Sequence, residues 1–106
     1  FNVIYAENDD MAKGAVAALD KANISHGVGK DVIVMGFDCN SWALEELLNQ
    51  NWNYDGQCNP YQASTIDGII KKLEAGEKLE DKVVMMEEKG FDATTITQED
   101  IDKYGI

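Results

Sequence analysis

The chain alternates between short, nearly continuous apolar runs and longer stretches whose apolar residues recur at helical spacing. The clearest run, D-V-I-V-M-G at residues 31–36, contains β-branched residues with no polar interruption. Such a run is typical of a strand covered on both faces, as in a parallel sheet. The alternation therefore predicts an α/β fold with a mainly parallel sheet flanked by helices.

The apolar periodicity and the capping residues give the expected order of elements. The order is a strand at 1–6, a helix at 10–23, a strand at 31–36, a helix after Ser41, a strand at 54–58, a helix starting at Pro60 and ending at Gly76, a strand at 83–86, and a helix after Thr97. Proline is favoured at the first helical position. Thr97 followed three residues later by Asp100 is typical of a capping box.

Charge and length restrict the class of protein. The 106 residues carry 20 acidic and 9 basic side chains, a net charge of −11. Such a field repels phosphate backbones, so no nucleic-acid partner is expected. No apolar run approaches the roughly 18 residues of a membrane helix. Phe1 opens directly on an expected strand with no leader before it, so either a targeting segment was removed or the chain is a piece of something longer.

The residues that most often carry catalysis or hold metals are few and scattered. Cys39 and Cys58 lack the C-x-x-C spacing, and His26 is the single histidine, so no metal site and no cofactor are expected. A disulfide between the two cysteines stays open. His26 lies in a glycine-rich loop far in sequence from any nucleophile. The chain is therefore not expected to be an enzyme.

Two polar residues follow directly after the first two expected strands. Consecutive parallel strands share direction, so Asn8 and Asp38 should emerge at the same edge of the sheet, where α/β proteins bind ligands. An amide and a carboxylate suit the hydroxyls of a sugar. Capping the next helix is the commoner role at such positions, and spacing alone favours it. Trp42 and Trp52 could stack on a sugar, although core packing is the more frequent role.

Several strings resemble one family across nearly the whole chain. Residues 5–15, Y-A-E-N-D-D-M-A-K-G-A, resemble the F-A-x-N-D-x-M-A-x-G-A segment of type I periplasmic sugar-binding proteins, the ribose-, galactose- and xylose-binding relatives. Residues 32–38, V-I-V-M-G-F-D, look like its V-x-V-V-G-F-D. Residues 58–61, C-N-P-Y, resemble its Q-N-P-Y, and residues 75–78, A-G-E-K, its K-G-E-K. The motifs occur in the family's order and at its spacing.

The resemblance implies an incomplete lobe of the periplasmic-binding-protein type I fold, which is Rossmann- or flavodoxin-like. The family's proteins have two lobes that close on a monosaccharide and deliver it to the permease subunits of an ABC importer. The implied location is the periplasm or the cell surface, with a lipid anchor as one option. Asn8 and Asp38 match family positions that hydrogen-bond the sugar. The third position, usually Gln, is Cys58 here; because a thiol bonds weakly, the sugar could differ from the common ones, or water could relay the contact.

The resemblance also implies a division of the chain. Residues 1–58 would be part of the C-terminal sugar-binding lobe. Residues 59–106 would hold the hinge crossing, a helix and a C-terminal strand and helix that pack with the other lobe. We expect the 106 residues alone to bind sugar weakly or not at all, and the exposed sheet edges of such a fragment to favour a homodimer.

Two alternatives share the same architecture. The first is the effector-binding domain of a LacI-type transcriptional repressor, which carries similar strings; the strong acidity and the extra capped helix favour the transport protein. The second is a stand-alone flavodoxin-like domain such as a receiver. Glu7 and Asp9 could mimic the acidic pair of a receiver, but no lysine follows a later strand in the required place.

Overall fold

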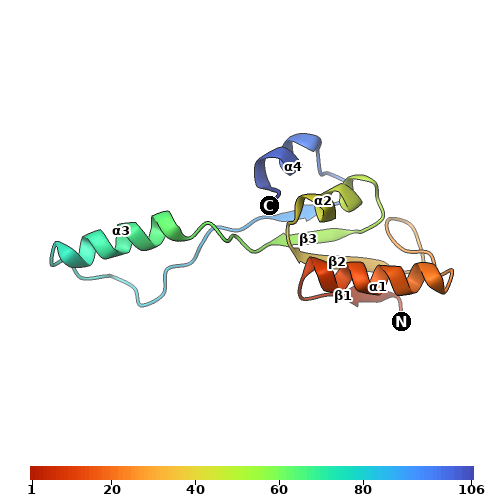
Figure 1. The fold of residues 1–106 in the computed structure, drawn as a ribbon, viewed down its shortest axis with the longest axis horizontal. Helices are drawn as coiled ribbons and strands as arrows, with labels where there is room; N and C mark the ends of the chain where they lie inside the picture. Colours follow the sequence, from red (N-terminus) through yellow and green to blue (C-terminus); the bar gives the residue numbers. More distant parts are fainter. The chain divides into compact units, whose positions relative to one another are not determined.

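The computed structural model describes all 106 residues, which form two compact units. The larger unit comprises Phe1–Cys58 and Lys89–Ile106 and is called the sheet unit below. The smaller one, Asn59–Glu88, is called the helical unit. Figure 1 shows the ribbon with the four helices and the first three strands labelled.

The sheet unit is built on one four-stranded sheet in the order β1-β2-β3-β4. The strands are β1 (Val3–Tyr5), β2 (Ile33–Asp38), β3 (Tyr54–Gln57) and β4 (Gly90–Asp92). β1 pairs parallel with β2 and β2 parallel with β3, whereas β4 runs antiparallel to β3. The predicted α/β fold with a mainly parallel sheet is confirmed.

Two helices connect the parallel strands and pack on one face of the sheet (Figure 1). They are α1 (Asp9–Lys21) and α2 (Ser41–Leu48). Both crossovers step one strand in the same direction, and right-handed crossovers of that kind put their helices on the same face. The core between the helices and the sheet contains side chains with almost no exposed surface, among them Val34, Leu44, Leu47 and Trp52.

The opposite face of the sheet is only partly covered. Tyr5 is 64% exposed and Ile33 41% exposed, and the Tyr5 and Phe37 rings meet edge to face at 5.4 Å. The expectation that residues 31–36 form a strand covered on both faces is therefore wrong for this chain. Continuous apolar character made β2 a strand, but the sheet unit supplies helices for one face only.

The last strand does not lie where the apolar run predicts it. Residues 83–86 form no strand, and Val83 and Met85 are largely exposed. The fourth strand is β4, in which Phe91 is buried and pairs with Asp55 of β3. β-propensity describes how a side chain suits a half-buried sheet, and without a partner strand it does not create one.

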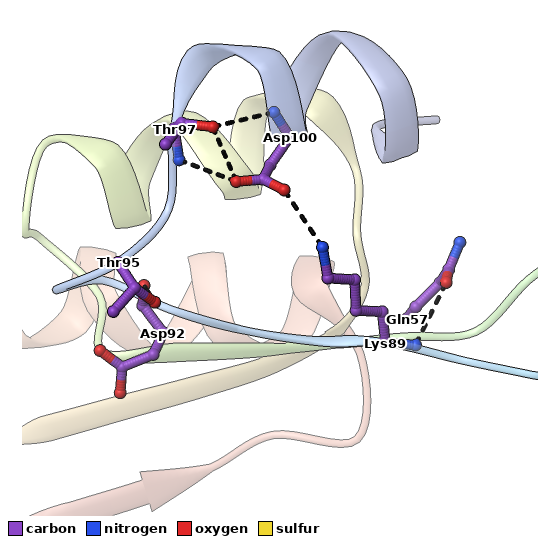
Figure 2. A network of polar contacts seen from close by, with 6 residues as sticks. All are labelled: Gln57, Lys89, Asp92, Thr95, Thr97 and Asp100. Atoms are coloured by element: carbon purple, nitrogen blue, oxygen red, sulfur yellow. Dashed lines mark hydrogen bonds and ion pairs between the residues drawn. The ribbon is translucent and has the colours of Figure 1, made fainter.

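The C-terminal residues return to the sheet unit. Lys89–Ile106 belongs to it, whereas residues 59–88 form the helical unit, and the packing of residues 59–106 with another lobe stays a prediction. The backbone N–H of Lys89 donates to Oε1 of Gln57 at 3.3 Å, and its ammonium group lies 3.2 Å from Asp100 (Figure 2). These bonds, with the pairing of β4, hold the C-terminal segment on the sheet.

Helix α4 (Gln98–Tyr104) starts as the sequence predicts. The Thr97 hydroxyl accepts from the Asp100 backbone N–H, and the Asp100 side chain accepts from the Thr97 backbone N–H (Figure 2). The capping box is thus confirmed. Ile96 and Ile101 are both buried beside it.

The helical unit consists of α3 (Ala63–Glu74) and the segment that follows it. The expected start at Pro60 is wrong by three residues, because the Asn59 side chain accepts from the Tyr61 backbone N–H at 2.9 Å and forms a turn. Gly76, at φ +78°, follows the helix end as predicted. No residue of α3 is buried, and Ile66 and Leu73 are about half exposed.

Gly36 tests how closely α1 approaches the sheet. A Cβ at this position would lie 2.5 Å from Oδ1 of Asp9 and 2.9 Å from the Trp52 ring, both of which are buried. We expect Gly36→Ala to lower the free energy of unfolding by about 1–3 kcal/mol through overpacking. Chemical denaturation measures this. The control is Gly14→Ala on α1, whose added methyl meets nothing within 4 Å and should stabilise by about 1 kcal/mol. Equal stability of the two variants would contradict the close approach.

Candidate functional site

The three residues predicted to bind ligand lie at one edge of the sheet. Tyr5 pairs with Met35, and Asn8 and Asp38 each follow three residues later. Asp38 in turn pairs with Gln57, and Cys58 is the next residue. Parallel pairing thus brings the carboxyl ends of β1, β2 and β3 together, which is where open α/β sheets bind ligands.

Asn8 caps the N-terminus of α1. Its Oδ1 accepts from the backbone N–H of Met11 at 2.8 Å, so the capping role favoured by the spacing is confirmed. The side chain is half-buried, and its amide nitrogen makes no hydrogen bond within the chain. One acceptor of Asn8 is therefore used by the helix, and two N–H groups are left to donate to a ligand.

Asp38 does not cap the next helix. The N-cap of α2 is Asn40, and the Asp38 backbone has φ +123° and is followed by Cys39 at φ +61°. Residues other than glycine adopt such angles rarely, and strained positions of this kind cluster at functional sites. Partial burial, followed by the charge of Asp9, raises the pKa of Asp38 above its usual value. The half-buried carboxyl group is held in an unusual backbone conformation at the end of β2.

The two cysteines have different surroundings and are not joined. Cys58 is exposed and Cys39 is buried, and both thiols are free. Burial, together with the charges of Asp55 and Asp9, raises the pKa of Cys39 far above that of an ordinary thiol. Gln57, the residue before Cys58, already accepts a hydrogen bond from the Lys89 backbone, so its carbonyl oxygen is occupied. Cys58 is the third polar side chain at the edge.

A second layer of carboxyl groups lies beneath this edge. Asp9 and Asp55 have no exposed surface, although they lie on different elements, α1 and β3. Oδ2 of Asp9 accepts from the backbone N–H of Asn40 at 2.9 Å and from its side-chain amide at 3.0 Å. Asp55 is not among the residues predicted from the sequence. The available signal was an aspartate inside a predicted strand, where this residue is depleted.

The tryptophans and the histidine do not join the site. Trp52 is in the core, and Trp42 meets it edge to face at 5.9 Å on the helix side of the sheet. His26 bonds to the carbonyl of Asn51 at 2.9 Å and to Asp20 at 3.0 Å. Burial of His26 opposes its charged form, but these two bonds outweigh it and raise the pKa. His26 thus closes a loop and does not face the strand ends.

The polar groups at the edge can hold a ligand through hydrogen bonds. The edge offers the amide donors of Asn8, the carboxyl group of Asp38 and a weak thiol partner in Cys58. No group of three or more His, Cys, Asp or Glu side chains is arranged to hold a metal ion. None of the helices has the length and apolar character needed to cross a membrane. The arrangement suits a neutral ligand rich in hydroxyl groups.

Solved structures with the same fold were found by comparison. A protein from Mycobacterium smegmatis in complex with β-D-fucofuranose is 30% identical, with a TM-score of 0.73 over 89% of this chain and 30% of that chain. A galactofuranose binding protein is 21% identical, with a TM-score of 0.83 over 98% of this chain and 34% of that one. An ABC transporter periplasmic solute binding protein from Actinobacillus succinogenes 130z with bound D-allose is 25% identical, with a TM-score of 0.74 over 98% and 34%.

These structures fix the class of the fold. The chain is a partial type I periplasmic-binding-protein fold, and the resemblance drawn from its motifs is confirmed. It spans about a third of the length of the solved structures that it matches. No protein-family model matches the sequence, and neither does any curated protein.

The two free thiols give a direct test of the site's exposure. At neutral pH we expect a thiol reagent to modify Cys58 rapidly and Cys39 only after unfolding, because Cys39 is buried and its pKa is raised. Counting modified thiols by mass spectrometry, with and without denaturant, measures this. The control variant Cys58→Ser should show no rapid labelling. Rapid labelling of both thiols, or a disulfide in the purified chain, would contradict the structure.

Proposed function

We propose that the chain forms part of a monosaccharide site in an extracytoplasmic solute-binding protein of an ABC importer. The observation that carries the proposal is the strained Asp38 at the end of β2, the strand that pairs in parallel with β1, after which Asn8 follows. The fold adds support, since the solved structures that share it include a galactofuranose binding protein and an ABC transporter solute binding protein with bound D-allose. No observation favours a repressor domain over this function.

Each of the three side chains would have a distinct role in binding. An ionised Asp38 would accept hydrogen bonds from two sugar hydroxyls, and charge-assisted bonds of this kind are the stronger ones. Asn8 would donate from the amide nitrogen that α1 leaves free. Cys58 would contact the sugar weakly or through water, because a thiol is a poor hydrogen-bond partner. The chemistry is recognition without a covalent step.

The helical unit would contribute to a second lobe. Ile66, Ile70 and Leu73 give α3 an apolar face that is about half exposed, and such faces normally pack against another element. In the proposed two-lobed protein, Asn59–Glu88 would pack with the other lobe, while the sheet unit would provide the wall that carries Asn8 and Asp38. The 106 residues by themselves would then bind sugar weakly or not at all.

The remaining partners follow from the same proposal. A protein of this class works in the periplasm or at the cell surface, free or lipid-anchored, and passes its sugar to permease subunits. The strongly negative charge suits a soluble carrier and gives no surface for nucleic acid. As an isolated piece the chain would pair through β1, an edge strand with one unpaired side, to form a homodimer.

Calorimetric titration with a panel of monosaccharides tests the function. The two proteins titrated are the 106-residue chain and a two-lobed protein that contains it. We expect tight binding of at least one sugar by the two-lobed protein and no sub-micromolar binding by the 106 residues. In the two-lobed protein, Asp38→Asn should weaken binding by about 10-fold to 100-fold, the value of a hydrogen bond to a charged group.

Two further variants separate binding from folding. Asn8→Asp keeps an oxygen to cap α1 and removes the donor, so it should weaken binding while the melting temperature stays unchanged. Asp10→Asn changes an exposed carboxylate in the same turn and should leave affinity within about two-fold. Unaltered affinity in both Asp38→Asn and Asn8→Asp would rule out this site, and no binding of any sugar by the two-lobed protein would rule out the function.

A further inference from the structure

Two carboxyl groups face each other inside the sheet unit with no counter-ion. Asp9 and Asp55 are fully buried, and each has one side-chain oxygen without a hydrogen-bond donor, Oδ1 of Asp9 and Oδ2 of Asp55. The two carboxyl groups meet beside Gly36, which pairs with Asp55 across the sheet and whose added Cβ would lie 2.5 Å from Oδ1 of Asp9. Oδ1 of Asp9 and Oδ2 of Asp55 are the only buried side-chain polar atoms in the chain that lack a hydrogen-bond partner.

A missing donor between two buried carboxyl groups has a simple chemical remedy. Two carboxylates can only accept hydrogen bonds, and at contact distance in a poorly solvated site they repel strongly. If one carboxyl group keeps its proton, it donates to the other, and both orphan oxygens are satisfied at once. Buried polar groups in folded proteins are nearly always paired in some such way.

The surroundings decide which of the two groups is protonated. Asp9 accepts two N–H bonds from Asn40 and is the first residue of α1, so the helix dipole and these donors stabilise a negative charge there. The Asp55 side chain accepts one hydrogen bond, from the Cys39 thiol at 3.9 Å, and the nearby Cys39 backbone is the only group that lowers its pKa. Its neighbours in the sheet offer no positive charge.

The charged and titratable groups near Asp55 come from the elements that pack around it. α1 supplies Asp9, and the end of β2 supplies Asp38 and Cys39. β4 places the apolar Phe91 opposite Asp55 in the ladder. Burial, the contact with Asp9 and the negative charge of Asp38 all raise the pKa of Asp55, to about 8, and only the Cys39 backbone opposes them.

We propose that Asp9 and Asp55 share one proton, with the carboxyl group of Asp55 donating to Oδ1 of Asp9, and that this bond positions the strand-end loop of residues 38–40. The loop depends on the pair because Asn40 donates two hydrogen bonds to the other oxygen of Asp9. Asp9 thereby links the buried core of β3 to the residues that follow Asp38. The role of the pair in positioning the loop for sugar binding rests on the proposed function. The sharing of a proton between Asp9 and Asp55 does not depend on that function.

The proton balance gives a direction with pH. Below the pKa of Asp55 the pair holds one proton and one negative charge. As the pH rises through the pKa of Asp55, this proton is released to solvent, and two negative charges remain in contact with each other. The unfolded chain loses the same proton near 3.8, so the folded state binds the extra proton between that value and about 8. Stability therefore falls across this window as the pH rises and levels off above it.

Thermal unfolding of the 106-residue chain from about pH 5 to about pH 9 tests the pair. Asp55→Asn places an amide donor where the protonated carboxyl group would be, at every pH. We expect its melting temperature relative to wild type to increase by about 5 °C or more across this range. The matched control, Asp81→Asn, alters an exposed aspartate of the helical unit and should follow wild type throughout. Taking differences from wild type removes the pH dependence contributed by His26.

Carbon-13 NMR of the wild-type chain supplies a second measurement, which does not depend on whether the Asp55→Asn variant folds. One aspartate carboxyl group should titrate near 8, far above the value of about 4 for an exposed aspartate. The Asn40 amide signals should shift with the same midpoint, which a carboxyl group with no positioning role would not cause. The proposal is overturned if all aspartates titrate below about pH 6, or if Asn40 does not respond. Neither measurement uses sugar, so failure here is distinct from failure of the binding function.

Discussion

Parallel pairing of β1, β2 and β3 is the constraint on which the candidate site depends. The pairs Tyr5–Met35 and Asp38–Gln57 fix which residues leave the sheet side by side. A slip of one residue in either pair would turn the strand's side chains to the other face and separate Asn8 from Asp38. The helices enforce the register, because Val34 and Gly36 must face α1 and α2 while Tyr5 and Phe37 face away.

The same few residues serve both the fold and the proposed binding of sugar. Asn8 gives one oxygen to α1 and keeps its amide hydrogens free, so a residue that caps a helix can also present donors at the sheet edge. Asp38 is the opposite case, since it does not cap the helix that follows it and has a rare backbone conformation. Capping and binding are therefore compatible at one position and separated at the other.

Local patterns predicted a large part of the fold. The alternation of apolar runs and helical periodicity gave the order of elements, and the capping box at Thr97 and the stop at Gly76 lie where the sequence put them. The strand predicted at 83–86 and the helix start at Pro60 were wrong. Residues 83–86 have no neighbouring strand to pair with. At Pro60, a turn formed by the Asn59 side chain delays the start of the helix.

The sequence alone determined the class of fold, the caps at Asn8 and Thr97 and the two polar residues that follow the first strands, because each depends on neighbours within a few positions. Only the tertiary structure decided that residues 89–106 return to the sheet, that one sheet face stays open, and that Asp9 meets Asp55. Asp9 and Asp55 are 46 positions apart in the sequence. Their contact depends on how closely α1 lies on Gly36 and β3, and this close packing also buries both side chains. No local sequence pattern contains that information.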